Sequence, residues 1–266
     1  MNRTSRIIAV TALGSAILAG LLFALPSTGQ AAPPVSINSC TTISTRGSYE
    51  LVADLTSSGT CIKITASHVK LKLNGHTITG PSAATVDSSG IQLVAVSHVD
   101  IEGPGVITNF GIAVDFEGAD RSEVKDVTAT GNLFGLNLNR DFVTPNLDDF
   151  SNKNVFRGNT STGNTIAGFT LNGASDNHLI NNVASNNNGN GIFIENGTEN
   201  QLKENTANGN AVAGIAIAAG STDNGVRGNT AQSNSFVDLA DDNPNCDNNV
   251  WTNNVFNTAS KTCIQC

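Results

Sequence analysis

The sequence predicts an all-β, single-domain parallel β-helix, a solenoid of roughly eight coils, and three repeated features support this fold class. The first is the phrase Gly-apolar-x-apolar, which in its last copies recurs every 23 residues, with starts at Gly111, Gly135, Gly168, Gly191 and Gly214. The second is Asn-x-apolar-x-x-Asn, which recurs every 23 or 24 residues in Asn154/Asn159, Asn177/Asn182, Asn200/Asn205, Asn224/Asn229 and Asn248/Asn253. The third is an alternation of inward and outward residues inside each copy. A fixed period of this length indicates one structural unit stacked on itself.

Each unit is built from strands and turns. Ile192 and Ile194 alternate with Phe193 and Glu195, which is the period of a strand with one buried face. By the same alternation Phe169 points into the core. Helical repeats are excluded because the region holds no 3.6-residue apolar stripe and is rich in Asn, Gly and Thr, which are poor helix formers. Three short apolar clusters per unit predict three strands joined by three turns.

Asparagine explains how the coil turns its corners, because Asn tolerates the left-handed backbone region better than most residues. When the same Asn recurs one coil later, its side-chain amide can hydrogen-bond to the amides above and below it, as in stacked cross-β arrays. The strict period excludes a disordered Asn-rich segment. We therefore predict one ladder of stacked amides, formed by Asn159, Asn182, Asn205, Asn229 and Asn253.

The earlier coils align less regularly. Ser67-His68-Val69, Ser97-His98-Val99 and Ser122-Glu123-Val124 are placed in the register of Asn177-His178-Leu179. Between Gly135 and Gly168 the period is exceeded by about ten residues, from Arg140 to Asp149. This insertion is expected to leave the coil as a loop, and insertions into solenoids commonly lie on the binding face.

The amino terminus has the order of a secretory signal peptide. Arg3 and Arg6 precede an apolar run, and Pro26 and Ala31 follow it, which predicts cleavage near residue 31 and an extracellular or periplasmic protein. We divide the chain into a signal peptide (1–31), an amino-terminal cap (32–66), the β-helix repeats (67–240), and the last coil with the carboxy-terminal cap (241–266). No membrane contact is expected after cleavage. The excess of Asp and Glu (22) over Lys and Arg (14) argues against a nucleic-acid partner.

The five cysteines lie outside the regular coils, at the two ends of the chain. Export makes disulfides plausible, and a solenoid needs its end faces capped. We expect Cys40 to bond to Cys61 in one cap, and Cys246 to bond to Cys263 or Cys266 in the other, with one cysteine left over.

The opening segments Gly47 to Leu51 and Leu71 to Gly80, and the closing segment Asp241 to Trp251, resemble those of bacterial right-handed parallel β-helix proteins, relatives of the pectate-lyase-like superfamily and of the NosD-like group. The resemblance covers essentially the whole chain after residue 31. It implies a right-handed coil and a ligand groove along the first sheet. Lys72 stands where family members often carry Asp. The motifs of polygalacturonase-like hydrolases and of alginate epimerases are missing.

The resemblance places candidate site residues on the outward face of the Gly-apolar-x-apolar strands. The expected outward column is Asp115, Asn139, Asn172 and Glu195, with Phe193 beside it, and the inserted loop adds four charged residues. A lyase would need an Arg or Lys base and acidic groups that bind calcium, so Arg140, Asp141 and Asp115 are the catalytic candidates. The ligand-binding candidates are Asn139, Asn172, Glu195, Phe193, Asp148 and Asp149. Calcium is the candidate cofactor.

Histidines suggest a weaker metal site. His68 and His98 fall on neighbouring coils of the alignment and Glu123 on the next, and imidazole with carboxylate suits copper or zinc. Three function classes therefore stay open. They are an extracellular carbohydrate-binding or structural module, a polysaccharide lyase acting on uronate polymers, and a NosD-like periplasmic metal-handling accessory. The expected partner is a polysaccharide or cell-surface glycan, and the oligomeric state is not predicted.

Overall fold

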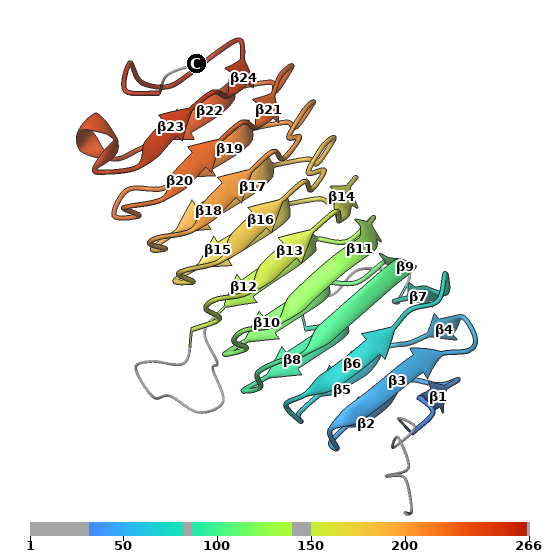
Figure 1. Cartoon of the computed structure of the whole chain (residues 1–266). Helices are drawn as coiled ribbons and strands as arrows, with labels where there is room; N and C mark the ends of the chain where they lie inside the picture. Colours follow the sequence, from blue (N-terminus) through green and yellow to red (C-terminus); the bar gives the residue numbers. More distant parts are fainter. Residues whose placement is uncertain (1–31, 82–86, 140–149, 265–266) are drawn as a thin grey trace, which may run out of the picture. The chain divides into compact units, whose positions relative to one another are not determined.

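The protein is described from a computed structural model, in which residues 32–81, 87–139 and 150–264 are described. Residues 33–266 form one compact unit. Within it every strand pairs with its neighbours in parallel, coil upon coil (Figure 1). The all-β, right-handed parallel β-helix expected from the sequence is confirmed. In the described part of the chain no helix is long and apolar enough to cross a membrane.

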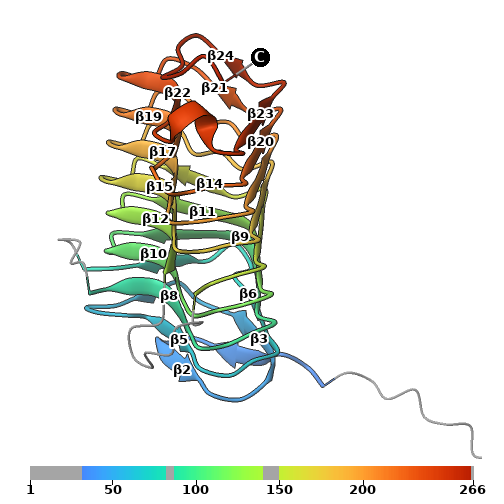
Figure 2. The ribbon, with the colours of Figure 1, turned by 90° about the vertical axis from the view of Figure 1, so that its left-hand side faces the viewer.

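The first sheet, here called sheet B, has nine strands and provides one strand to each coil (Figure 2). Its strands, in spatial and chain order, are β2 (Thr41–Ile43), β5 (Ile62–Ile64), β8 (Ser89–Val94), β10 (Ile112–Glu117), β12 (Phe134–Asn139), β15 (Ala167–Asn172), β17 (Asn190–Glu195), β19 (Ala213–Ile217) and β22 (Val237–Asp241). The count is close to the eight coils expected.

The second sheet, here called sheet A, has thirteen strands; it covers a second side of the stack and, in the earlier coils, part of the third side as well (Figure 2). Its main path is β1 (Val35–Ile37), β3 (Gly47–Leu51), β6 (Val69–Lys72), β9 (Asp100–Thr108), β11 (Glu123–Thr130), β13 (Val155–Arg157), β16 (His178–Ile180), β18 (Gln201–Lys203), β20 (Gly225–Arg227) and β23 (Val250–Thr252). Off this path lie β4 (Leu55–Thr56), β7 (Thr77–Thr79) and β14 (Thr160–Thr162), and β21 (Thr230–Ala231) pairs with β24 (Val255–Phe256). The remaining element is the short 3₁₀ helix η1 (Pro244–Cys246).

The core is the column of apolar side chains enclosed by the two sheets. Phe116 packs on Phe156 with ring centroids 5.2 Å apart, and Phe156 packs edge-on against Phe169 at 6.2 Å. All three rings are fully buried. Phe169 is therefore a core residue, as the alternation predicted, while Phe193 lies on the outer side of sheet B and is half-buried.

Three asparagine ladders, rather than the single one predicted, run along the axis. In each, the side-chain oxygen of one Asn accepts hydrogen bonds from both the backbone N–H and the side-chain amide of the Asn one coil earlier, at 2.8–3.1 Å for Asn182, Asn205 and Asn229. The three ladders are Asn154–Asn177–Asn200–Asn224–Asn249, Asn159–Asn182–Asn205–Asn229–Asn254 and Asn132–Asn164–Asn187–Asn210–Asn234. The same pattern of Asn hydrogen bonds therefore recurs at each of the three corners of the coil.

The left-handed backbone belongs to the residue before each ladder Asn. Lys153, Asp176 and Glu199 have φ near +60°, and each precedes a buried Asn of the first ladder. The predicted ladder member Asn253 is wrong for this reason: it has φ 55°, and Asn254 accepts the bonds of Asn229. The spacing in this last step is 25 residues rather than 24, so counting by the earlier period stops one residue short.

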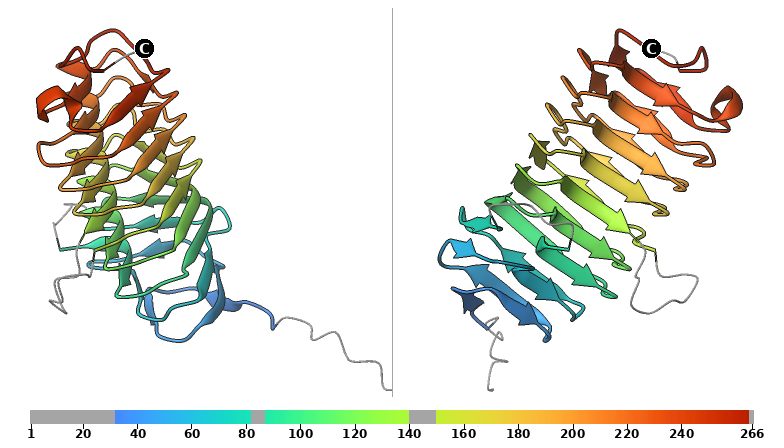
Figure 3. Two further views of the ribbon diagram at one scale, coloured as in Figure 1. Left: turned by 60° about the vertical axis from the view of Figure 1, so that its left-hand side comes forward. Right: turned by 180° about the vertical axis from the view of Figure 1, so that it is seen from behind.

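Two disulfides close the ends of the stack, whose successive coils are seen from two further sides in Figure 3. Cys40 bonds to Cys61, as predicted. Cys246 bonds to Cys263, which settles the alternative that the sequence left open. Cys266 lies outside the described residues.

Candidate functional site

Two rows of outward-facing side chains run across sheet B. Backbone pairing places Asp115 beside Gln92 on one side and Asn137 on the other, and continues through Thr170 to Phe193. We call this the inner row. Its three central members, Asp115, Asn137 and Thr170, are buried although they point away from the core.

Two residues further along the same strands lies the outer row, formed by Glu117, Asn139, Asn172 and Glu195. All four side chains are half-buried, so they reach solvent. The Glu117 carboxylate accepts a hydrogen bond of 2.9 Å from the Gln92 amide. Phe193, the inner-row neighbour of Glu195, is likewise half-buried and adds an aromatic edge to this line.

The expected outward column was wrong in one member, Asp115. The structure pairs Asp115 with Asn137, and Glu117 takes the place beside Asn139. The error arises because Ala113, rather than Gly111, occupies the glycine position of this coil. The phrase that begins at Gly111 is therefore two residues out of register with the phrase that begins at Gly135. A shift of two residues leaves the inward and outward alternation of the strand unchanged.

Asp115 is a buried carboxyl group in the inner row. It accepts a hydrogen bond of 3.3 Å from the Asn137 amide, and the Ser89 hydroxyl lies 3.5 Å from its other oxygen. Burial, with the Glu117 carboxylate close by, raises the pKa of Asp115 from 3.8 to about 7. The group therefore exchanges a proton near neutral pH, but it has almost no surface with which to touch a polymer.

Thr170 stands out in the same row because its hydroxyl has no partner. Its side chain is 8% exposed, and Oγ1 is the one buried side-chain nitrogen or oxygen without a hydrogen bond among the described residues. Buried polar atoms are rarely left unsatisfied, because each costs about 1–3 kcal/mol. The Thr170 hydroxyl is therefore a buried, unsatisfied polar group beneath the surface of sheet B.

The distance between the two carboxylates of the outer row is compatible with sugar binding but too large for glycoside hydrolysis. Glu117 and Glu195 lie three coils apart in the outer row, or about 14 Å at the usual strand spacing. The two acids of a glycoside hydrolase lie within about 10 Å of each other. The outer row therefore has groups suited to hydrogen-bonding sugar hydroxyls but not an acid pair that spans one glycosidic bond.

Four predicted site residues, Arg140, Asp141, Asp148 and Asp149, lie outside the described residues, and their role stays a prediction. The coil on either side of them is continuous. The Ser151 hydroxyl donates to the Asn139 carbonyl at 2.8 Å and lies 3.1 Å from the Phe116 carbonyl, so β12 ends beside the point where the coil resumes.

The histidines only partly fulfil the metal hypothesis. The rings of His68 and His98 stack with centroids 4.8 Å apart and planes inclined by 20°. Because imidazole lone pairs lie in the ring plane, two nearly parallel rings do not direct them at one ion. Glu123 belongs to another row: it pairs with Asp100, and its carboxylate lies 3.8 Å from Arg157. The alignment that joined it to the histidines was two residues out of register.

Other metal donors are also scattered. His76 Nδ1 lies 3.1 Å from an oxygen of Asp54. That contact and the Thr77 backbone N–H lower the pKa of Asp54, with the Thr77 bond the larger cause. Among the described residues no three His, Cys, Asp or Glu side chains gather where a metal ion could be held. Within 32–81, 87–139 and 150–264 the donors therefore form neither a copper site nor a cluster of carboxylates for calcium.

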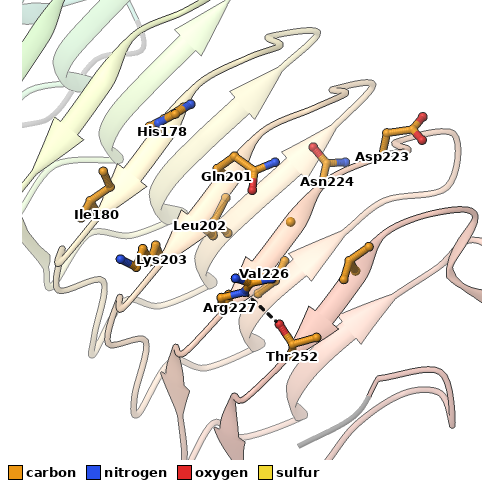
Figure 4. Close-up of a pocket in the computed structure, with 12 residues that line it drawn as sticks. His178, Ile180, Gln201, Leu202, Lys203, Asp223, Asn224, Val226, Arg227 and Thr252 are labelled. Atoms are coloured by element: carbon orange, nitrogen blue, oxygen red, sulfur yellow. Dashed lines mark hydrogen bonds between the residues drawn. The ribbon is translucent and has the colours of Figure 1, made fainter.

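A groove on sheet A is a site that the sequence reasoning missed. It has a volume of about 530 Å³ and runs across the outer side of β16, β18, β20 and β23 (Figure 4). Lys203 and Arg227 lie together in it, while His178, Gln201 and Asp223 line its other part. A signal was present: Gly225 stands in the repeat position held by Gln201 one coil earlier, so one side chain is missing from an otherwise filled row.

Comparisons with known proteins agree with this architecture. A variant of the periplasmic alginate epimerase AlgG is 12% identical, with a TM-score of 0.55 over 84% of this chain and 74% of that one. The Azotobacter vinelandii mannuronan C-5 epimerase AlgE6 A-module is 9% identical, with a TM-score of 0.50 over 82% and 80%. At these identities the likeness shows the fold alone. No curated protein matches the chain significantly. A model of the family described as periplasmic copper-binding protein (NosD) matches residues 42–264, most of the chain, and the protein therefore belongs to the NosD family.

Proposed function

We propose that this protein is an exported polysaccharide-binding β-helix whose ligand lies along the outer row of sheet B. One observation carries the proposal: Glu117, Asn139, Asn172 and Glu195 form an unbroken line of half-buried hydrogen-bonding side chains across four successive coils. Amide and carboxylate oxygens accept hydrogen bonds from sugar hydroxyls, and amide nitrogens donate to them. Phe193 offers an apolar edge for a sugar ring.

The charge of the row limits the ligand. Two carboxylates and two amides suit a neutral polysaccharide, because a uronate would bring further negative charge beside Glu117 and Glu195. A uronate polymer fits this line with a bridging cation, and calcium is the candidate because it prefers oxygen ligands. The structural relatives support the ligand class, since AlgG and AlgE6 are both named as enzymes of polysaccharides. The NosD family description supports a periplasmic location.

The catalytic and copper-handling alternatives have less support from the residues described. Asp115, a catalytic candidate expected to help bind calcium, is buried in the inner row and hydrogen-bonded to Asn137. The stacked histidines lack a third ligand nearby. The proposed function therefore involves no metal-dependent reaction, and the binding experiment below also tests for polymer cleavage.

The test is a binding panel of dextran, galactomannan, alginate and polygalacturonate, each with calcium and with a chelator. We expect the double variant N139A/N172A to weaken binding of the polymer that the wild type binds on sheet B by about tenfold. Two lost amide hydrogen bonds remove about 1–2 kcal/mol, and 1.4 kcal/mol is a factor of ten in Kd. Isothermal titration calorimetry measures the change.

Asn188→Ala is the matched control, because Asn188 is an exposed amide outside both rows. Equal affinities of N139A/N172A and wild type would place the ligand elsewhere, and a wild type that binds no polymer in the panel would overturn the proposal. Absorbance of unsaturated sugar products in the same mixtures would show a lyase instead of a binding module.

A further inference from the structure

We propose that the groove on the outer side of β16, β18, β20 and β23 is a second binding site, specific for an acidic polysaccharide. The groove lies on a different sheet from the outer row and is independent of the proposed function of that row. Its shape and the separation of charge within it both fit such a ligand.

The hollow exists because one row of sheet A lacks a side chain at Gly225. This row runs from His178 to Gln201, Gly225 and Val250, one residue per coil. With no side chain at Gly225, the backbone of β20 is open, and the flexible end of Gln201 reaches over it. Val250 is 52% exposed and closes the far side of the hollow.

Cations occupy the neighbouring row. Ile180, Lys203, Arg227 and Thr252 follow one another in register, which places the backbones of Lys203 and Arg227 about 4.8 Å apart on adjacent strands. Both side chains are exposed. Arg227 uses its Nε to donate to the Thr252 hydroxyl at 3.2 Å, so the terminal guanidinium nitrogens remain for a ligand. Lys203 lies 3.3 Å from Glu204, but such an exposed pair is worth little and yields readily to a better anion.

The two outward rows that cross the groove carry only cations among their charged residues, although the chain has a formal net charge of −8. From β13 to β23 the two outward rows of sheet A hold Arg157, Lys203 and Arg227 and not one carboxylate among the described residues. Nearer the amino terminus the same rows are mixed, and the Glu102 carboxylate is held by both Lys70 and Lys125 at 2.9 and 2.8 Å. Lys203 and Arg227 thus form a row of cations along the groove, with the Glu204 and Asp223 carboxylates beside it rather than in the two rows.

The opposite rim favours a sugar over other polyanions. His178 and Gln201 offer hydrogen-bonding groups there, and Asp223 adds an acceptor at the edge (Figure 4). An acidic sugar presents a carboxylate on one side of its ring and hydroxyls on the other, which matches a cationic row beside a neutral row with an acceptor. Polyphosphate and DNA have no comparable set of hydroxyl donors for these groups.

The test uses polygalacturonate fragments in the presence of a chelator, so that binding through calcium on sheet B is suppressed. We expect K203Q/R227Q to raise Kd at least tenfold and the wild-type affinity to fall as salt is added. Gly225→Val should also raise Kd at least tenfold without changing any charge. Valine is tolerated in this row at Val155 and Val250, and the atom that the new side chain meets is the flexible end of Gln201.

The matched control is K63Q/K72Q, which removes two cations outside the groove and should change Kd less than twofold. The same titrations in N139A/N172A separate the two sites, since that variant should retain full binding in chelator. An unchanged Kd for Gly225→Val, or no binding of polygalacturonate by the wild type, would overturn the groove assignment. Equal or tighter binding of single-stranded DNA with the same sensitivity to the variants would show that the ligand class is wrong.

Discussion

Replacing Asn205 with alanine is expected to lower the free energy of unfolding by about 3 kcal/mol, because an unsatisfied buried polar group costs about 1–3 kcal/mol. The Asn205 side chain donates to the Leu179 carbonyl and to the Asn229 side-chain oxygen. Its own oxygen accepts from the backbone N–H and the side-chain amide of Asn182. The substitution leaves the Leu179 carbonyl and the Asn182 N–H without these partners inside the stack. Thermal unfolding followed by circular dichroism should show Tm lower by roughly 6–12 °C for a protein of this size.

The control for this change is Asn188→Ala, which replaces an exposed Asn. It should shift Tm by less than about 2 °C, as surface substitutions usually do. Asn196 is less suitable although it is exposed, because its φ is 52° and alanine in that region adds a backbone penalty of about 1 kcal/mol. Similar shifts for Asn205→Ala and Asn188→Ala would mean that the ladder contributes little to stability.

Replacing Asp115 with asparagine is expected to stabilise the protein at alkaline pH and to leave it nearly unchanged at acid pH. The folded state raises the pKa of Asp115 from 3.8 to about 7, so it binds the proton more tightly than the unfolded chain does. Its stabilising contribution is complete below about pH 4 and is lost as pH rises toward and through 7. At pH 8 the buried group is ionised and destabilises the fold, a cost that the neutral amide avoids.

Asparagine retains the local contacts of Asp115, since its oxygen accepts from Asn137 and its nitrogen donates to the Ser89 hydroxyl. Denaturant unfolding at pH 4 and pH 8 measures the effect. Glu195→Gln, a half-buried carboxylate on the same sheet, is the control and should keep the pH dependence of the wild type. If the free energy of unfolding changed with pH in the same way for the wild type and the Asp115→Asn variant, burial would not raise the pKa of Asp115.

Several features of the fold follow from local sequence. The alternation of apolar residues defines the strands and their buried faces, so that Phe169 in the core and Phe193 on the outside were both predicted. The position of the cysteines before and after the regular coils led to Cys40–Cys61 and to Cys246 with one of two partners. The residues beyond the period placed the insertion after Asn139.

The sequence alone determined that the chain is a parallel β-helix with a 23-residue repeat and an amide ladder at one of its turns, because periodicity and alternation are properties of the chain itself. Only the tertiary structure decided which residues of different coils are neighbours. The misplacements of Asp115 and of His68 and His98 were both slips of two residues, and such a slip leaves every side chain on the same face of its strand. Alternation cannot detect it, since the inward and outward pattern is unchanged. Packing of whole coils, which brings Val114 against Leu136 and closes the groove around Gly225, fixes the register and with it the chemistry of both surfaces.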